Sequence, residues 1–214
     1  MNRLSGAPTV PLPCRLVFLL ILCFLSHTPT PLNARPIIPF VPEGSRVTFH
    51  AKAAFHKFSG TTSSVSGEVE FPAIGNLEGV TGVVHIASGS LKTGIRKRDR
   101  EMYRLLDVDQ FPEIVYALQR VLVEARNEQG VPERIRLSGT VTVRGQERPL
   151  QLSGRLGHED SLVTVEGSGE LDMQDFGLKP PRILFWKVQP VVQVTFRVSL
   201  EVPLRLLLGK PEEK

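Results

Sequence analysis

Cysteine is almost absent from this sequence. Its 214 residues include two, Cys14 and Cys23, and both lie near the N-terminus. From residue 24 onward the chain therefore has no thiol, which excludes a disulfide, a thiolate-bound metal and a cysteine nucleophile from that part. A domain built from those residues must be stabilised by its own apolar core.

The common catalytic motifs are also missing. The sequence contains no Gly-x-Ser-x-Gly elbow, no His-Glu-x-x-His helix and no glycine-rich phosphate loop. Its histidines are scattered, and His50 and His56, on one face of an expected strand, would lie about 20 Å apart. The carboxylates of Asp172 and Asp175 flank a turn on a polar face. We therefore expect no catalytic residue, no metal site, no protein cofactor and no enzyme activity.

No apolar run is long enough to span a bilayer comfortably, which takes about 20 residues. The longest run, Leu16 to Leu25, follows Arg15 and precedes a polar, proline-rich stretch. A basic start, a short apolar core and a polar exit are typical of a secretory signal peptide. We predict that residues 1–34 are such a signal and that the protein is exported. An uncleaved N-terminal anchor is the alternative.

The chain also lacks a large excess of charge of either sign. Without residues 1–34, which hold Arg3 and Arg15, 24 basic residues face 22 acidic ones, a net charge of +2. This balance argues against a nucleic-acid partner. A local exception is the run from Arg96 to Arg100, with Arg104 nearby. Two interpretations of this run stay open, a solvated helix start and an anion site.

What the sequence does contain is alternation of apolar and polar residues, repeated in eight stretches between Ser45 and Leu204. The cleanest runs from Val192 to Val202, with apolar residues at every second position. A period of two places one face of a strand in an apolar interior and the other in water. In the stretch that begins at Ile114 the phase shifts before Val121, which a β-bulge would explain.

Only one segment, Ile95 to Asp107, has the spacing of an amphipathic helix. Short turns join the strands elsewhere, which favours an antiparallel meander over parallel βαβ units. We therefore predict an all-β fold, an antiparallel eight-stranded barrel over residues 45–204 with one short helical crossover. Residues 35–44 are expected to be a proline-rich linker, and residues 205–214 a C-terminal tail.

A barrel of this size has an interior that side chains fill or that holds one small ligand. Several small residues fall on the expected inner face: Ala51, Ala53, Gly67 and Gly139. They would leave room for a ligand, or they would accommodate the coiling of the strands. The sequence leaves both explanations open.

Four blocks, in order, resemble the signature of the YceI-like family. They are Ser90 to Ile95 followed by Arg98-Asp99, Asp107 and Phe111-Pro112 with the strand through Tyr116, Leu137 to Gly145 followed by Arg148-Pro149-Leu150, and Asp175 with Phe176-Gly177-Leu178. The resemblance covers about residues 45–203. It departs near Met173-Gln174 and before the last strand, where Trp186 to Pro190 replace the usual acidic turn.

The resemblance implies a lipocalin-like barrel in an exported bacterial protein, periplasmic or extracellular, that binds a long apolar molecule. Polyisoprenoids, isoprenoid quinones and fatty amides are the ligands of the family. We expect no cofactor unless a bound isoprenoid or quinone-like lipid is counted as one.

We accordingly expect a set of mostly aromatic and aliphatic side chains to line an apolar pocket: Phe49, Phe58, Phe71, Leu91, Leu105, Leu106, Phe111, Tyr116, Phe176, Trp186 and Phe196. Arg96, Arg98 and Arg100 are candidates for a ligand head group, because a guanidinium makes forked contacts with phosphate.

The alternative function is a non-catalytic interaction barrel with a solid core. It would act through its surface or through the apolar segment Pro203 to Leu208, which also offers a peripheral contact with a membrane. The sequence leaves the oligomeric state open.

Overall fold

The computed structural model describes residues 35–53, 56–183, 186–203 and 206–207. The predicted signal peptide, residues 1–34, lies outside the described residues, as does most of the predicted tail, residues 205–214. Within the described part the chain is mainly β-strand, with one α-helix and two short 3-10 helices.

The elements follow one another in chain order as β1 (Ile37–Ala53), β2 (His56–Thr62), β3 (Val65–Glu70), β4 (Thr81–Ala87), η1 (Ser88–Ser90), α2 (Arg96–Leu106), β5 (Glu113–Arg126), β6 (Pro132–Val143), β7 (Gln146–Glu159), β8 (Leu162–Asp172), η2 (Met173–Phe176), β9 (Arg182–Ile183), β10 (Trp186–Lys187) and β11 (Val191–Glu201). β9 and β10 form a separate two-stranded sheet.

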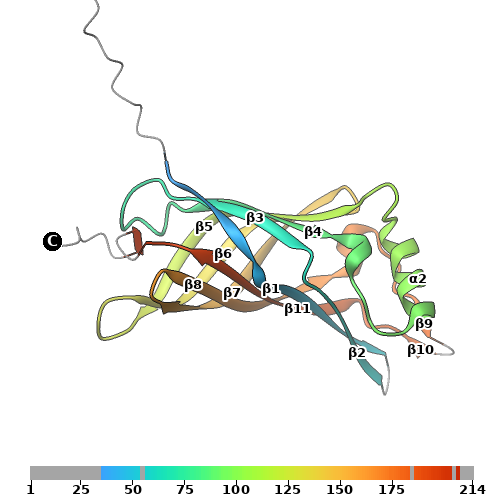
Figure 1. Ribbon diagram of the computed structural model, residues 1–214. Coiled ribbons are helices and arrows are strands. Elements are labelled where there is room, and N and C mark those ends of the chain that lie inside the picture. Colours follow the sequence, from blue (N-terminus) through green and yellow to red (C-terminus); the bar gives the residue numbers. More distant parts are fainter. Residues whose placement is uncertain (1–34, 54–55, 184–185, 204–205, 208–214) are drawn as a thin grey trace, which may run out of the picture. The chain divides into compact units, whose positions relative to one another are not determined.

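The other nine strands form one antiparallel sheet that closes on itself. Their order is β11-β8-β7-β6-β5-β4-β3-β1-β2, and β11 also pairs with β1. β2 and β3 pair with successive parts of the same edge of β1, so together they occupy one position in the wall. The result is a closed barrel with eight strand positions (Figure 1). The predicted all-β, eight-stranded antiparallel barrel with one helical crossover is confirmed.

The predicted linker at residues 35–44 is wrong, because the first strand already begins at Ile37. Ile38 and Phe40 are buried, and Phe40 pairs with Leu200 of β11. The prolines of this stretch conceal the strand in the sequence. Proline cannot donate a hydrogen bond to a sheet ladder, so its presence argues against a strand. The strand accommodates them with a register shift between Val41 and Arg46, which has the character of a β-bulge.

The expected bulge in β5 is present. The pairing of β5 with β6 shifts register between Leu118 and Arg120, and Val121 beyond the shift is buried. The helix is also confirmed, within one residue at each end of the expected span. It ends where Asp107 adopts a left-handed backbone conformation, with φ of 54°.

Glycines on the inner face serve the close approach of neighbouring strands. A Cβ on Gly139 would lie 2.1 Å from the carbonyl oxygen of Ala117, and one on Gly67 would lie 2.2 Å from that of Val83. No side chain fits at those distances. At these two positions the structure therefore supports strand coiling rather than room for a ligand.

Candidate functional site: a cavity inside the barrel

The barrel encloses a cavity of about 810 Å³. Inward-facing side chains of all eight wall positions line it, together with one face of α2, and nearly all of them are aliphatic or aromatic. The alternation seen in the sequence produces this lining directly, because every second residue of each strand points inward. The interior of the barrel is thus a hollow with apolar walls.

One end of the cavity is closed. Leu77 and Val80 in the β3–β4 connection are 6% and 4% exposed, and Val202 and Leu207 near the C-terminus are 1% and 2% exposed. All four line the cavity. Figure 1 shows the β3–β4 connection and the end of β11 at the side of the barrel opposite α2. These residues form the floor.

The other end opens to solvent beside α2. Ile95, just before the helix, lines the cavity and is 54% exposed, and the exposed residues Lys97 and Glu101 line it as well. Lining residues at this end, such as Phe49 and Phe58, are only partly buried. The mouth of the cavity therefore lies between α2 and the strands near it.

Two aromatic rings of the wall lie over glycines of neighbouring strands. Phe49 pairs with Gly60, and Phe196 pairs with Gly167. A Cβ on either glycine would lie within 3 Å of the ring opposite, at 2.2 Å for Phe49 and 2.7 Å for Phe196. Each ring thus rests against its neighbouring strand, an arrangement that leaves the centre of the barrel free. Phe49 also meets Phe58 edge to face, with ring centroids 6.4 Å apart.

Hydrogen bonds fix the loop before α2 to the helix. Asp99 accepts from both the backbone N–H, at 2.8 Å, and the hydroxyl of Thr93. Arg98 donates from Nε to the Thr93 hydroxyl oxygen at 2.8 Å and from a terminal nitrogen to the Thr93 carbonyl at 3.0 Å. The Tyr103 hydroxyl donates to the Leu91 carbonyl at 2.6 Å. Residues 91–95 are therefore held as one rim of the mouth.

Charge is concentrated at this mouth. Lys97, Arg98 and Glu101 of α2 line the cavity, whereas Glu68, the one other charged residue among the described lining residues, is an exposed residue of β3. The Arg98 guanidinium lies 4.4 Å from the centroid of the Phe58 ring, within the range of a cation–π contact. Arg98 thus connects α2 to β2 across the mouth.

Two tyrosines of the site stay uncharged at neutral pH. Burial raises the pKa of Tyr116, in the cavity wall, to about 12. Burial also raises the pKa of Tyr103, and the negative charge of nearby Asp99 adds to the rise. The Tyr116 hydroxyl in the cavity wall is therefore neutral, whereas three of the four charged lining residues, Lys97, Arg98 and Glu101, belong to α2 at the mouth.

Most of the predicted pocket residues are brought together by the fold. Those that line the cavity are Phe49, Phe58, Phe71, Leu91, Leu105, Leu106, Tyr116 and Phe196. Of the three predicted head-group residues, Arg98 also lines the cavity. That these nine residues bind a ligand stays a prediction.

Phe111 and Phe176 do not line the cavity, which corrects their predicted placement. Both border a separate surface hollow with polar walls, beside Arg144 and Arg148. Phe111 lies against the β6–β7 turn, where a Cβ on Gly145 would come within 2.9 Å of its ring, and Phe176 is buried in η2. Each follows a change of chain direction, where strand periodicity no longer tells which way a side chain points.

Arg96 and Arg100 are likewise absent from the lining. They lie four residues apart on α2, so they share a face of the helix, and both are exposed. The side chain of Trp186 lies outside the described part of the structure. Many lining residues were not among the predicted pocket residues, and those near α2 include Thr93, Lys97, Glu101 and Met102. For Met102 the signal was available, because it belongs to the apolar stripe of the predicted helix.

Other kinds of site are not found in the described part of the chain. Among its residues, no cluster of three histidine, cysteine or acidic side chains is arranged to hold a metal ion. None of its helices combines the length and apolar character needed to cross a membrane.

Comparison with known proteins places this geometry in context. The sequence matches the YceI-like domain over residues 40–200. No curated protein sequence matches the chain significantly. BcnA of Burkholderia cenocepacia is similar in structure, with a TM-score of 0.61, 16% identity, and coverage of 72% of this chain and 95% of that one. A polyisoprenoid binding domain from Saccharophagus degradans gives a TM-score of 0.61 at 14% identity, covering 79% of this chain and all of that one.

Proposed function

The chain belongs to the YceI-like domain family, and on that premise we propose that it is a non-catalytic binding protein that holds a long apolar molecule inside its barrel. The observation that carries the proposal is the cavity of about 810 Å³, floored at one end and open beside α2. Its volume falls within the range of known small-molecule sites, about 300–1,000 Å³.

The distribution of polar groups supports an amphiphilic ligand. The walls bury an apolar chain, and each buried CH₂ group contributes about 0.8 kcal/mol to its binding. Lys97 and Arg98 stand at the mouth, where the polar end of such a molecule would lie. An isoprenoid, an isoprenoid quinone and a fatty-chain lipid all have this form. The structural similarity to a polyisoprenoid binding domain favours an isoprenoid chain.

The proposal includes a location. With residues 1–34 acting as a secretory signal, the protein would work in the periplasm or outside a bacterial cell, where an apolar molecule needs a carrier or a store. Family membership supports this assignment. The alternative, an interaction barrel with a solid core, is disfavoured by the hollow interior.

The test first identifies the bound ligand and then blocks its binding with a bulky side chain in the cavity. Native mass spectrometry and organic extraction of the purified protein should both yield a chain-like lipid. Val194→Trp places a bulky ring in the hollow, whereas Gln193→Trp places the same ring on the exposed face of the same strand. We expect the first variant to lose lipid and the second to retain it. Lipid-free wild-type protein, or equal retention by both variants, would refute the proposal.

A further inference from the structure

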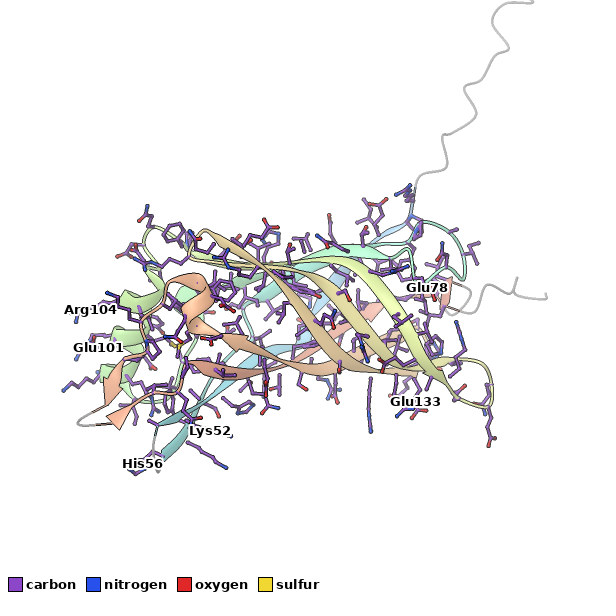
Figure 2. The ribbon with its side chains drawn as sticks, turned by 180° about the vertical axis from the view of Figure 1, so that it is seen from behind. Lys52, His56, Glu78, Glu101, Arg104 and Glu133 are labelled. Carbon is purple, nitrogen blue, oxygen red and sulfur yellow. The ribbon has the colours of Figure 1, made fainter. Side chains whose placement is uncertain are left out.

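The charge of the barrel is distributed unevenly along its axis. Residues 51–60 and 91–104 contain eight basic and two acidic side chains, a net charge of +6. Residues 35–214 as a whole carry a net charge of +2, so the remainder carries −4. Figure 2 shows Lys52, His56 and Arg104 at one end of the barrel and Glu78 and Glu133 at the other. The basic end is the one with the mouth.

The basic side chains come from three separate segments that the fold brings to this end. Lys52 and Lys57 are paired across β1 and β2, and Lys92 lies in the loop before α2. Arg96, Lys97, Arg98, Arg100 and Arg104 belong to α2. We call these eight side chains the basic rim. All except Arg98 are exposed.

Most of the rim is not neutralised by its own acids. Asp99 is engaged by the hydroxyl and the amide of Thr93, and Glu101 pairs with Arg104 at 2.9 Å. Among the described residues, the remaining rim cations except Arg98 form no ion pair or side-chain hydrogen bond. Their charge therefore projects a positive potential from the mouth into solvent.

An exposed apolar side chain stands among these cations. Ile95 is 54% exposed at the edge of the cavity, directly before Arg96. A single exposed isoleucine is ordinary on a protein surface. Here, however, it is surrounded by basic residues and adjoins an apolar cavity. Basic residues beside apolar ones are the combination by which peripheral proteins bind anionic lipid surfaces.

We propose that the α2 end docks on an anionic lipid bilayer, with the basic rim binding lipid phosphates and Ile95 entering the interface. This inference deepens the proposed function and rests on it. With the mouth against the bilayer, an apolar ligand passes between membrane and cavity without crossing water. The two features, a basic end and an open end, thus serve one transfer step.

The experiment measures binding of the full chain to vesicles of pure phosphatidylcholine and to vesicles in which a third of the lipid is phosphatidylglycerol. The variant Lys92→Gln/Arg96→Gln/Arg100→Gln removes three rim charges without touching a cavity-lining side chain. The matched control, Arg120→Gln/Arg134→Gln/Arg155→Gln, removes three exposed charges from the strands β5, β6 and β7. Circular dichroism and thermal melting establish that each variant is folded.

Wild type and control should prefer the anionic vesicles, and the preference should weaken with added salt. The rim variant should lose on the order of 100-fold in affinity, because each basic side chain near an anionic surface contributes about fivefold. Equal binding by the rim variant and the control would overturn the proposal. This is also the result expected if the basic rim binds an acidic protein instead of lipid.

A second measurement reads which end touches the lipid, independently of any anchoring by the N-terminus. In Ile95→Trp, lipids brominated near the headgroup should quench the added fluorescence, whereas Leu122→Trp on β5, exposed near the floor end, should be unaffected. Absence of quenching at position 95 would contradict the docking. Lipid content, measured by extraction of the wild-type protein, separates the two claims. Wild-type protein that retains lipid but shows no preference for anionic vesicles refutes docking alone, whereas wild-type protein that docks but holds no lipid refutes the proposed function.

Discussion

Asp99 should hold the rim of the mouth in place. Its carboxylate accepts the Thr93 amide at 2.8 Å and the Thr93 hydroxyl, and Thr93 in turn accepts from Arg98. Hydrogen bonds to a charged group contribute about 1.5–3 kcal/mol each, and partial exposure of the site lowers the contribution of the two bonds together to about 1.5–3 kcal/mol. An acidic residue in the first turn of a helix adds about 0.3–1 kcal/mol. Asp99→Ala should therefore lower the free energy of unfolding by about 2–4 kcal/mol.

Urea denaturation measures this loss, and Asp109→Ala is the matched control because Asp109 is exposed beyond the end of the helix. Hydrogen exchange gives a local readout, since the Thr93 amide has Asp99 as its acceptor. Peptides that cover residues 88–95 should lose protection in Asp99→Ala and keep it in the control. Stabilities of the two variants within about 0.5 kcal/mol of each other, with unchanged exchange at Thr93, would refute the reasoning.

Three further predictions follow from the walls and the mouth. Folding raises the pKa of Tyr116 above the ordinary value of 10.0 to about 12, so the stability that this shift contributes is complete below pH 10 and is lost as pH rises through 12. Tyr116→Phe should flatten that part of the curve of stability against pH, and an unchanged curve would contradict the assignment. Gly167→Ala would place a Cβ 2.4 Å from a backbone oxygen of β7 and should destabilise by about 1–3 kcal/mol, whereas Gly157→Ala, with its nearest atom 3.8 Å away, should be close to neutral in thermal melts. Arg98→Ala should lower retention of a prenyl phosphate more than that of the matching prenyl alcohol, and equal effects on the two ligands would show that Arg98 does not contact the head group.

The walls of the barrel were predictable from the sequence because strand periodicity is a local property. In β11, alternation from Val192 to Val202 corresponds to the register with which it pairs along β8. The helix was predictable for the same reason. Prediction failed at residues 37–44, where prolines concealed a strand whose partners, β3 and β11, are distant in sequence.

The site was predictable in part. Side chains on regular strands, such as Phe49 and Phe196, line the cavity as their alternation indicates. Phe111 and Phe176 follow a helix end and lie in a 3-10 turn, where orientation depends on tertiary contacts. Arg98 is separated from Arg96 and Arg100 by helix periodicity, because it lies four and seven residues before Met102 and Leu105, and all three line the cavity. The contacts of Arg98 with Thr93, in contrast, depend on the loop before α2 and could not be predicted from periodicity.

The most direct measurement is a crystal structure of the protein purified without organic solvent. We expect continuous, elongated electron density inside the barrel, running from the floor at Leu77 to the mouth beside Arg98. An interior filled by repacked side chains, or one that holds only ordered water along its whole length, would contradict it.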